Sequence, residues 1–275
     1  PMSSTIMSVA AGLIMVTCSS ARAQDGALDL SFNPTDVGYG SGDGVTSSAV
    51  HAIHLRSDGK ITIAGNFVAN TSTNTNVGRL NADGSWFGGF SVDAPNATVY
   101  DIAEQPDGKM IIVGLLSMVN GTACNNIVRL NTDGSVDTSF DPGTGPNGSL
   151  WSVALLSNGK IVISGIFNAF NGTPCGGVAL LAANGSVDAS FQSLPGPNFQ
   201  VRNITVQADD KLLVGGTFTT YHGTSCGRIA RLNANGSLDV GFTTGTGADS
   251  EVTSSTIQPD GKIIIGGSFT LFNGT

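Results

Sequence analysis

Residues 257–270, Ile-Gln-Pro-Asp-Gly-Lys-Ile-Ile-Ile-Gly-Gly-Ser-Phe-Thr, contain the pattern that decides the fold of this chain. A turn tripeptide ending in Lys is followed by an apolar run, a Gly five residues after the Lys, and a large apolar residue two positions later. The pattern occurs five times, with successive lysines 49, 51, 51 and 51 residues apart. These lysines are Lys60, Lys109, Lys160, Lys211 and Lys262. A fixed period near 50 residues is typical of a repeat architecture.

Each repeat predicts four short antiparallel strands joined by tight turns. In the second repeat the strands are expected at residues 99–104, 109–114, 126–131 and 135–140. The intervening Pro-Asp-Gly and Thr-Asp-Gly stretches suit turns that need a fixed φ or a positive φ. Four-stranded units of this length are typical blades of a β-propeller. We therefore expect an all-β protein, a partial β-propeller of about five four-stranded antiparallel blades with an incomplete last blade. A β-solenoid is the alternative.

The hairpin between the third and fourth strands predicts specific side-chain pairs. Its register places Leu130 opposite Val136 and Arg129 opposite Asp137, and Arg231 and Asp239 pair in the same way two repeats later. One repeat lacks the Arg and another lacks the Asp, which a catalytic pair could not tolerate. We interpret these as cross-strand surface pairs, each stabilising the fold by well under about 1 kcal/mol.

Composition narrows the classes of partner. The chain has 275 residues, of which 38 are Gly and 40% are apolar, including 13 Phe, so it can bury a sizeable core. Only 12 Lys and Arg stand against 20 Asp and Glu, giving a net charge of −8. No basic stripe can form on such a chain, so we expect neither a nucleic acid nor an anionic membrane as partner.

The first 23 residues predict a secretory signal peptide. An apolar run from Thr5 to Cys18 precedes Ala21-Arg22-Ala23, an Ala-x-Ala cleavage pattern. The run is shorter than the roughly 20 residues of a membrane span. We expect a signal peptide at 1–23, the propeller at 24–275, and a secreted or cell-surface protein. A lipoprotein anchored through Cys18 and a buried helix are the alternatives.

Three further cysteines repeat with the same period. Cys124, Cys175 and Cys226 lie 51 residues apart, so they occupy one position in successive repeats. Equivalent positions of sheets packed face to face lie about 10 Å apart, whereas a disulfide needs Cα atoms within about 7 Å. We predict small buried thiols without a disulfide, within the chain or between chains. No Cys-x-x-Cys pair indicates zinc.

The repeat resembles the delta-60 repeat family, bacterial β-propeller repeats of unknown function in exported proteins. Residues 257–270 carry the resemblance, together with residues 229–239, Ile-Ala-Arg-Leu-Asn-Ala-Asn-Gly-Ser-Leu-Asp. It covers the mature chain in about four and a half copies, and the first copy departs most, at residues 86–90. The resemblance implies a bacterial source and supplies no catalytic residue.

Few motifs indicate chemistry, and none indicates a cofactor. His51 and His54 could bind a metal, but no third ligand accompanies them, and a surface pair is the simpler interpretation. The acids of the predicted channel strands are Asp101, Glu104 and Glu251, and glycosidic cleavage needs two facing carboxylates. We therefore favour an exported non-enzymatic binding or scaffold module for a protein or glycan at the cell surface. The alternative is an extracellular glycan hydrolase or lyase with its acids in the channel.

The expected ligand-binding residues lie at the end of the propeller where loop sequences vary between repeats. Side chains that differ from repeat to repeat, held on a rigid sheet framework, suit recognition. They are Asp36, Tyr39, Asp43, Phe199, Tyr221 and His222. The first three lie in a long loop, 33–47, which is either slack or a ligand or calcium site. The aromatic side chains could instead fill gaps between blades.

Overall fold

The computed structural model describes residues 45–69, 76–94 and 97–275. The predicted signal peptide lies outside these residues, and so do Asp36, Tyr39, Asp43 and the proposed lipid-anchor residue Cys18. The regular structure of the described residues consists of antiparallel strands. None of them forms a helix long and apolar enough to cross a membrane.

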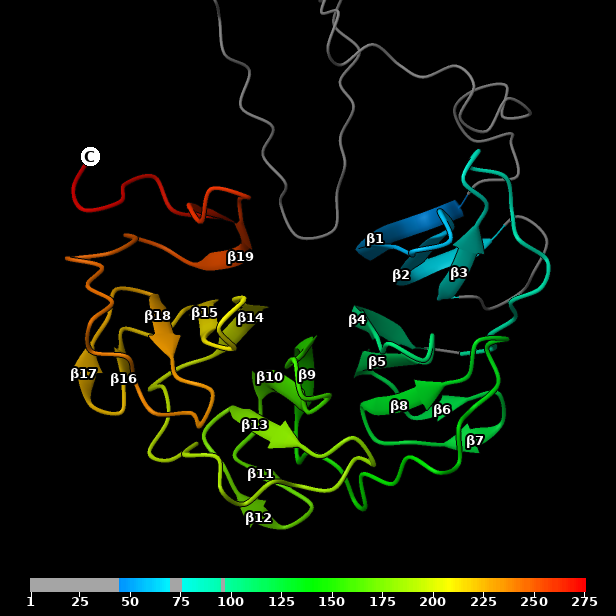
Figure 1. Ribbon diagram of the computed structural model, residues 1–275, viewed down its shortest axis with the longest axis horizontal. Coiled ribbons are helices and arrows are strands. Elements are labelled where there is room, and N and C mark those ends of the chain that lie inside the picture. The colour runs from blue at the N-terminus through cyan, green and yellow to red at the C-terminus, as the bar shows by residue number, and fades with distance from the viewer. Residues whose placement is uncertain (1–44, 70–75, 95–96) are drawn as a thin grey trace, which may run out of the picture.

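The strands form five blade sheets arranged in an arc around a central channel (Figure 1). Their strands, in chain order, are β1 (Val45–Leu55), β2 (Ile61–Ala69) and β3 (Val77–Leu80); β4 (Thr98–Glu104), β5 (Met110–Leu115) and β8 (Ile127–Leu130); β9 (Ser149–Leu155), β10 (Ile161–Ile166) and β13 (Val178–Leu181); β14 (Val201–Val206), β15 (Leu212–Gly216) and β18 (Ile229–Leu232); and β19 (Val252–Ile257) and β20 (Ile263–Gly267). The first strand of each blade lies beside the first strand of the next and borders the channel. The propeller fold expected from the repeats is therefore confirmed.

Three small hairpins lie in the loops between the second and third strands of blades 2, 3 and 4. They are β6 (Met118–Val119) with β7 (Thr122–Ala123), β11 (Ala169–Phe170) with β12 (Thr173–Pro174), and β16 (Thr220–Tyr221) with β17 (Thr224–Ser225). Single bridges, Pro146 with Phe170 and Pro197 with Tyr221, tie the hairpins of blades 3 and 4 to the loops that enter those blades. We call the end of the propeller that carries these hairpins and entry loops the loop end, and the opposite end the turn end.

The fourth strand of each blade is shorter than predicted. Leu130 pairs with Val136 as expected, but this pairing is a single bridge, and blades 1, 3 and 4 show the same. In blades 2 and 3 the next residue is Asp137 or Asp188, and its Oδ1 accepts hydrogen bonds from the backbone N–H and hydroxyl of the serine two residues later (3.0 and 2.7 Å for Asp137 and Ser139). This side-chain turn bends the backbone away from its neighbour and ends the pairing.

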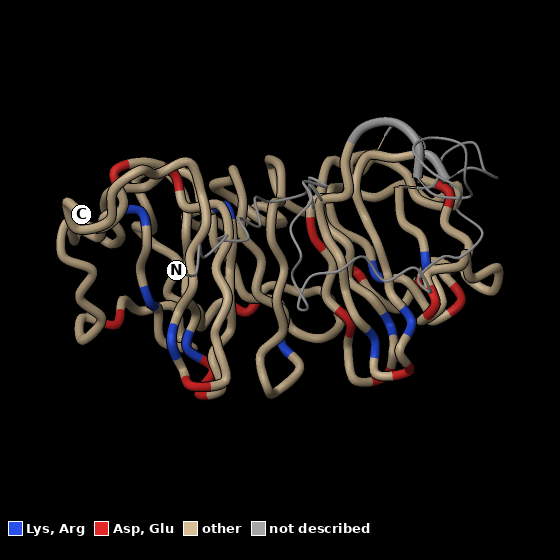
Figure 2. The backbone as a smooth tube through the Cα atoms, turned by 90° about the horizontal axis from the view of Figure 1, so that it is seen from above, with Lys and Arg blue, Asp and Glu red and all other residues tan. Residues whose placement is uncertain are grey.

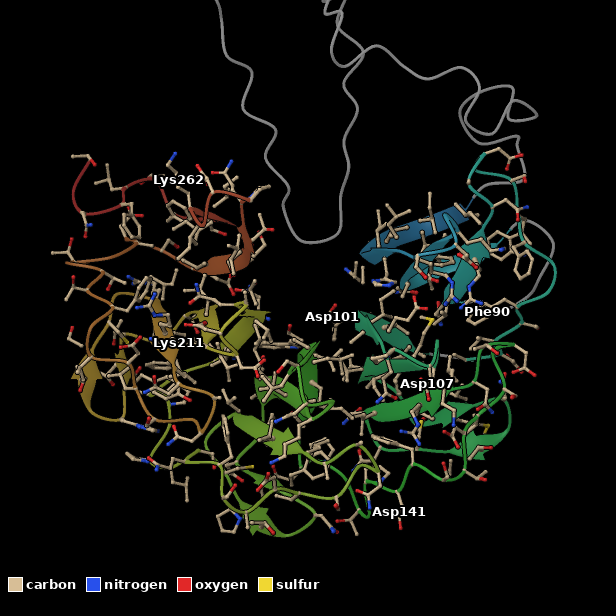
Figure 3. The ribbon with its side chains drawn as sticks, in the orientation of Figure 1. Phe90, Asp101, Asp107, Asp141, Lys211 and Lys262 are labelled. Atoms are coloured by element: carbon tan, nitrogen blue, oxygen red, sulfur yellow. The ribbon has the colours of Figure 1, made fainter. Side chains whose placement is uncertain are left out.

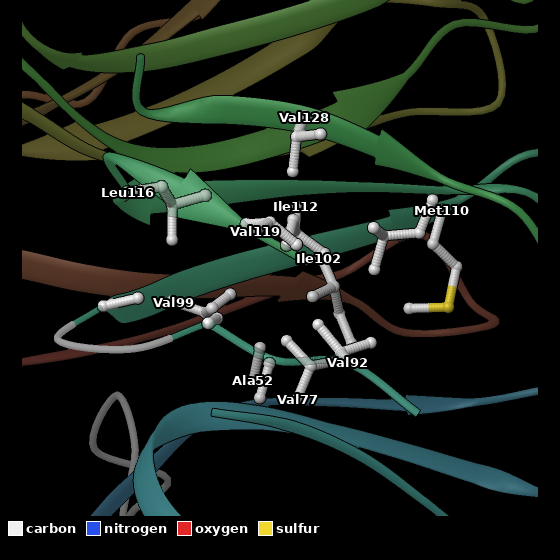
Figure 4. Close-up of a cluster of buried hydrophobic side chains, with 14 of the residues drawn as sticks. Ala52, Val77, Val92, Val99, Ile102, Met110, Ile112, Leu116, Val119 and Val128 are labelled. Atoms are coloured by element: carbon white, nitrogen blue, oxygen red, sulfur yellow. The ribbon is translucent and has the colours of Figure 1, made fainter. Parts of the chain in front are cut away.

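The hydrophobic core lies between blades. Met110 and Ile112 of β5 pack towards blade 1, in the cluster of Figure 4. Ile111 and Val113 of the same strand pack towards blade 3. Both faces of the strand are therefore buried, which explains its unbroken apolar sequence.

The Arg129–Asp137 pair also joins blades, and the prediction that it is a surface pair is wrong, whereas Arg231 and Asp239 are half-buried and pair within their own blade. Arg129 Nε lies 2.8 Å from Asp137 Oδ2, and the two residues are only 8% and 7% exposed. Arg129 Nη1 also donates to the carbonyl of Ala183 in the turn of the next blade (2.6 Å). The turn of the next blade covers the pair. The prediction failed because it was made from the sequence of a single repeat, which does not include that turn.

A Lys–Asp ion pair recurs beside the Arg–Asp pair at the turn end. The distances from Lys Nζ to Asp Oδ2 are 2.7 Å for Lys109 and Asp137, 2.6 Å for Lys160 and Asp188, and 2.9 Å for Lys211 and Asp239. Each contact joins the turn between the first and second strands of a blade to the residue that follows the single bridge of its fourth strand. Many of the charged residues lie towards one end of the blades in Figure 2, in keeping with these repeated pairs.

The repeating cysteines are free thiols, as predicted. Cys175 and Cys226 are buried and Cys124 is half-buried. Burial raises the pKa of each thiol to about 11, so none is a reactive thiolate at neutral pH.

Candidate ligand site at the channel mouth

Every inner strand carries a β-bulge near its start. In β4, Val99 pairs with Gly114 and Asp101 pairs with Val113, which leaves Tyr100 between them without a partner residue on β5. The same shift occurs once at the equivalent place in each of the other blades. The five bulged residues are His51, Tyr100, Trp151, Arg202 and Thr253. A bulge redirects the side chain of its extra residue, and bulges are frequent beside active sites.

The recurring glycine of the sequence pattern makes this bulge possible. A Cβ atom on Gly114 would lie 2.0 Å from the carbonyl oxygen of Thr98 on the inner strand. The same distance, 2.0 Å, separates a Cβ at each of the other four glycines from an inner-strand carbonyl. These glycines are Gly65, Gly165, Gly216 and Gly267. Only glycine permits so close an approach of two backbones.

The bulged side chains come together in one cavity of about 280 Å³. We call His51, Tyr100, Trp151, Arg202 and Thr253 the channel ring; Glu251 is the sixth residue lining the cavity. All six are half-buried, so each presents part of its surface to the channel. Because the bulges lie near the starts of the inner strands, the channel ring lies at the loop end.

Contacts within the channel ring hold its polar and aromatic groups in place. The guanidinium of Arg202 stacks 3.6 Å from the ring centroid of Trp151, and its Nε forms an ion pair with Glu251. His51 and Tyr100 lie with ring centroids 5.4 Å apart, tilted by 55°. Burial lowers the pKa of His51, so its imidazole is uncharged at neutral pH. The site thus combines aromatic surface with a neutral imidazole and a fixed guanidinium.

The three acids of the inner strands are each held by donors. Asp101, at the inner edge of its blade (Figure 3), accepts hydrogen bonds at Oδ2 from Ser152 Oγ (2.8 Å) and from the N–H of Val153 (2.9 Å). Burial raises the pKa of Asp101 to about 6. Glu104 pairs with His54 Nε2 (2.8 Å) and Arg56 Nη1 (2.7 Å). Asp101 and Glu104 therefore join neighbouring inner strands.

The predicted site residues are separated by the structure. Phe199 is 64% exposed in the loop that enters blade 4. Tyr221 has no exposed surface; it packs against Phe218 with ring centroids 6.0 Å apart, so it belongs to the core and not to a ligand surface. Phe170 takes the equivalent place 51 residues earlier and is buried as well. The repeat therefore uses an aromatic ring at this position to fill the core, which is why Tyr221 is not exposed to a ligand. His222 is half-buried with its ring centroid 4.7 Å from that of Tyr221, and burial lowers its pKa.

Sequence reasoning missed four members of the channel ring: Tyr100, Trp151, Arg202 and Thr253. A signal was present, because each follows directly after an apolar residue that pairs with the recurring glycine. These positions lie 51 residues apart, yet no two carry the same side chain. A comparison of the repeats at this one position, where the framework is constant and the side chain changes, would have singled out these residues.

The histidines considered as metal ligands have other environments. His51 belongs to the channel ring, whereas His54 contacts Glu104. Among residues 45–69, 76–94 and 97–275, no three His, Cys, Asp or Glu side chains are grouped so that they could hold a metal ion.

Comparison with known proteins gives a family but no activity. The family model described as a β-propeller domain of unknown function (DUF5122) matches residues 56–85, 105–140, 156–191, 207–242 and 258–275. It confirms a β-propeller repeat family of unknown function, while the narrower delta-60 assignment stays a prediction. No curated protein matches the chain.

Several solved structures share the fold at low identity. A streptogramin B lyase is 19% identical with a TM-score of 0.47, and the match covers 81% of this chain and 61% of that one. A gluconolactonase from Xanthomonas campestris is 13% identical (TM-score 0.46; 79% and 69% covered). PorZ, a surface component of the type-IX secretion system of Porphyromonas gingivalis, is 13% identical (0.48; 79% and 31%). The chain therefore spans less than two thirds of the streptogramin B lyase, and these likenesses concern the fold alone.

Proposed function

We propose that this chain, which belongs to the DUF5122 β-propeller family, is a binding module whose ligand enters the mouth of the channel and contacts the channel ring. The observation that carries the proposal is the set of five bulges. A glycine in every blade preserves the same backbone distortion, and each distortion presents a different side chain to one cavity. Distinct side chains on a rigid scaffold are what selective binding requires.

A glycan is the ligand class that this chemistry favours over a protein. Trp151 and Tyr100 offer ring surface on which the C–H face of a sugar can stack, while His51, Thr253 and Arg202 offer donors and acceptors for hydroxyl groups. A cavity of about 280 Å³ suits one or two sugar rings better than a protein surface, which needs a broad interface. Export to the cell surface, expected from residues 1–23, would bring the module to such ligands.

Binding to a glycan array followed by titration calorimetry tests the proposal. We expect at least one glycan to bind, and Trp151→Ala to weaken its affinity at least about tenfold, equivalent to about 1.4 kcal/mol. Val240→Ala, an 81% exposed position, is the matched control and should bind as the wild type does. Glycan binding that Trp151→Ala leaves unchanged would place the ligand elsewhere.

An enzyme acting on glycans is the second candidate, and one observation favours it. A carboxyl with a pKa near 6 can act as a general acid at neutral pH, and burial raises the pKa of Asp101 to about 6. Incubation with polysaccharides and an assay for new reducing ends tests this candidate. Cleavage by the wild type that Asp101→Asn abolishes would support it, and intact polysaccharide would leave the binding module as the function.

A further inference from the structure

A second cleft opens at the loop end between blades 3 and 4. Its volume is about 530 Å³, within the usual range of about 300–1,000 Å³ for ligand sites. Gly165, Gly176 and Gly177 line it, so backbone is accessible there. Its apolar members include Ile166, Leu194 and Phe199, which are 44%, 54% and 64% exposed.

The cleft is polar without being charged. Amide side chains line it together with the apolar residues: Asn147, Asn168, Asn198 and Gln200. None of the described residues that line it is Asp, Glu, Lys, Arg or His. The amides of Asn147 and Asn198 hold their own loops on the hairpins, which leaves Gln200 and the Nδ2 of Asn168 for a ligand. Amide groups beside an aromatic face match a ligand with an apolar face and hydroxyls, which is the chemistry of a neutral sugar. A charged ligand would find no counter-charge in this cleft.

Phe199 has no role in the repeated framework. The equivalent positions in the blades that precede and follow hold Ala97, Gly148 and Ser250. Blade packing therefore does not need a ring at this position, and at 64% exposure Phe199 buries little of its surface. Together with the exposed Ile166 and Leu194, which line the same cleft, Phe199 forms an exposed apolar patch, and such patches mark ligand-binding grooves.

The loop that carries Phe199 is held firmly on the hairpin of its own blade. Asn198 Oδ1 accepts hydrogen bonds from the N–H groups of Thr219 (2.9 Å) and Thr220 (3.0 Å), and its Nδ2 donates to Thr219 Oγ1 (3.0 Å). Pro197 forms a bridge with the buried Tyr221. The ring is therefore presented in a fixed position, which lowers the entropy cost of binding.

The cleft and the channel ring are neighbours along two strands. Gly165, which lines the cleft, pairs with Leu150, the residue before Trp151. Gln200, which also lines the cleft, lies two residues before Arg202. The two sites therefore lie on neighbouring residues at the same end of the propeller, as a ligand that spans both would require.

We propose that this cleft is a second saccharide subsite, in which Phe199 stacks on a neutral sugar residue of an oligosaccharide whose other end occupies the channel ring. The inference rests on the proposed function, because it assigns the ligand of the channel ring to the same class. It adds that the ligand is an uncharged oligomer longer than the channel ring alone can hold.

Calorimetry with uncharged oligosaccharides of increasing length tests the inference. The probes are the malto-, cello- and chito-oligosaccharides from one to six sugar units. In the wild type we expect the affinity for one series to rise at least about tenfold with length, because a second subsite adds binding energy within the same ligand. Phe199→Ala should remove this gain and leave the affinity for the shortest bound member within about twofold; Val240→Ala should keep both.

The outcomes separate the two proposals. Binding that depends on Trp151 but gains equally with length in Phe199→Ala overturns the second subsite and leaves the proposed function standing. Absence of binding to all three series overturns the subsite, and the proposed function falls with it if the glycan array is also empty. Binding of unstructured peptides that requires Phe199, with no saccharide bound, shows a peptide site and overturns the saccharide assignment.

Discussion

Gly114 faces the inner strand of its own blade where a methyl group would lie 2.0 Å from the carbonyl of Thr98. The contact is with backbone, so no side-chain rotation can relieve it. The site therefore depends on residues that never touch a ligand, and the geometry of Tyr100 is set from the strand beside it. Sequence inspection found this glycine as a marker but gave no cause for it, because the cause is a close approach between strands.

Substitution of this glycine is the first prediction. Gly114→Ala should lower the free energy of unfolding by at least about 2 kcal/mol, as overpacking against rigid backbone does. Urea denaturation measures the loss. Gly88→Ala is the control, since a Cβ there meets nothing within 4 Å, and its unfolding curve should overlay that of the wild type. Equal stability of the two variants would contradict the role assigned to Gly114.

Asp101 gives a prediction about pH. Its pKa of about 6 in the folded protein is above its ordinary value of 3.8, so the folded state holds the proton more tightly than the unfolded state does. This contribution to stability is complete below about pH 4 and is lost as the pH rises through 6, by at most about 1.4 kcal/mol per pH unit. Asp101→Asn should remove that loss.

The measurement is the free energy of unfolding of both proteins from pH 4 to pH 7.5. The variant should gain stability relative to the wild type as the pH rises, since an amide oxygen can still accept from Ser152 and Val153. A constant difference between the two proteins across this range would refute the assignment.

Between strands and turns, Asp137 joins three parts of the structure. It accepts from Lys109 of one turn, from Arg129 of the third strand and from Ser139 of its own segment. These donors, Lys109 first, hold the pKa of Asp137 well below its ordinary value. Its stabilising effect is therefore present above about pH 4 and fades as the pH falls below that.

Asp137→Asn should lower the free energy of unfolding by about 3 kcal/mol at pH 7, because it leaves Arg129 buried without its carboxylate. The deficit should shrink in measurements from pH 4 towards pH 2, because the carboxyl takes up a proton in the unfolded wild type there while the folded protein keeps it ionised. Asp83→Asn, in an exposed turn of the first blade, is the control and should cost far less, because Asn184 and Asn235 at the equivalent positions accept the same hydrogen bonds from a serine. A deficit in Asp137→Asn that stays the same at low pH would show that charge is not its source.

The local sequence pattern predicted the pairing within the hairpins correctly, but it did not predict which side chains the neighbouring blades bury. Turn residues set the register correctly, as the bridge between Leu130 and Val136 shows. The burial of Arg129 was missed because the carbonyl of Ala183 that covers it comes from the next repeat. Tyr221 was expected at the ligand surface because its loop differs between repeats, with filling of a gap between blades as the alternative; it is buried, as Phe170 is at the same repeat position.

At the scale of the whole molecule, the hydrophobic core lies at the interfaces between adjacent blades, which we call the seams. Each hydrophobic cluster draws residues from adjacent sheets, so a single blade exposes both of its apolar faces in isolation. Repeat proteins of this kind gain stability from interfaces between neighbours more than from single repeats.

A polypeptide of residues 98–140, one complete blade, should therefore be unfolded by circular dichroism. Residues 97–242, which span three blades and keep two seams, are the matched comparison and should show a β signal and a thermal transition. A cooperative transition in the single blade would contradict an arrangement in which the seams supply the stability.

The bulges have a consequence for how such a protein can change over generations. Each blade delivers one side chain to the channel, and a glycine on the adjacent strand fixes the delivery whatever that side chain is. Duplication or recombination of a repeat therefore transfers the bulged residue together with the glycine that positions it. A point mutation at the bulge changes one side chain in the channel and leaves the scaffold unchanged. Selectivity in this architecture can be assembled combinatorially, one blade at a time, by evolution or by an engineer exchanging Trp151 for the residue of another repeat.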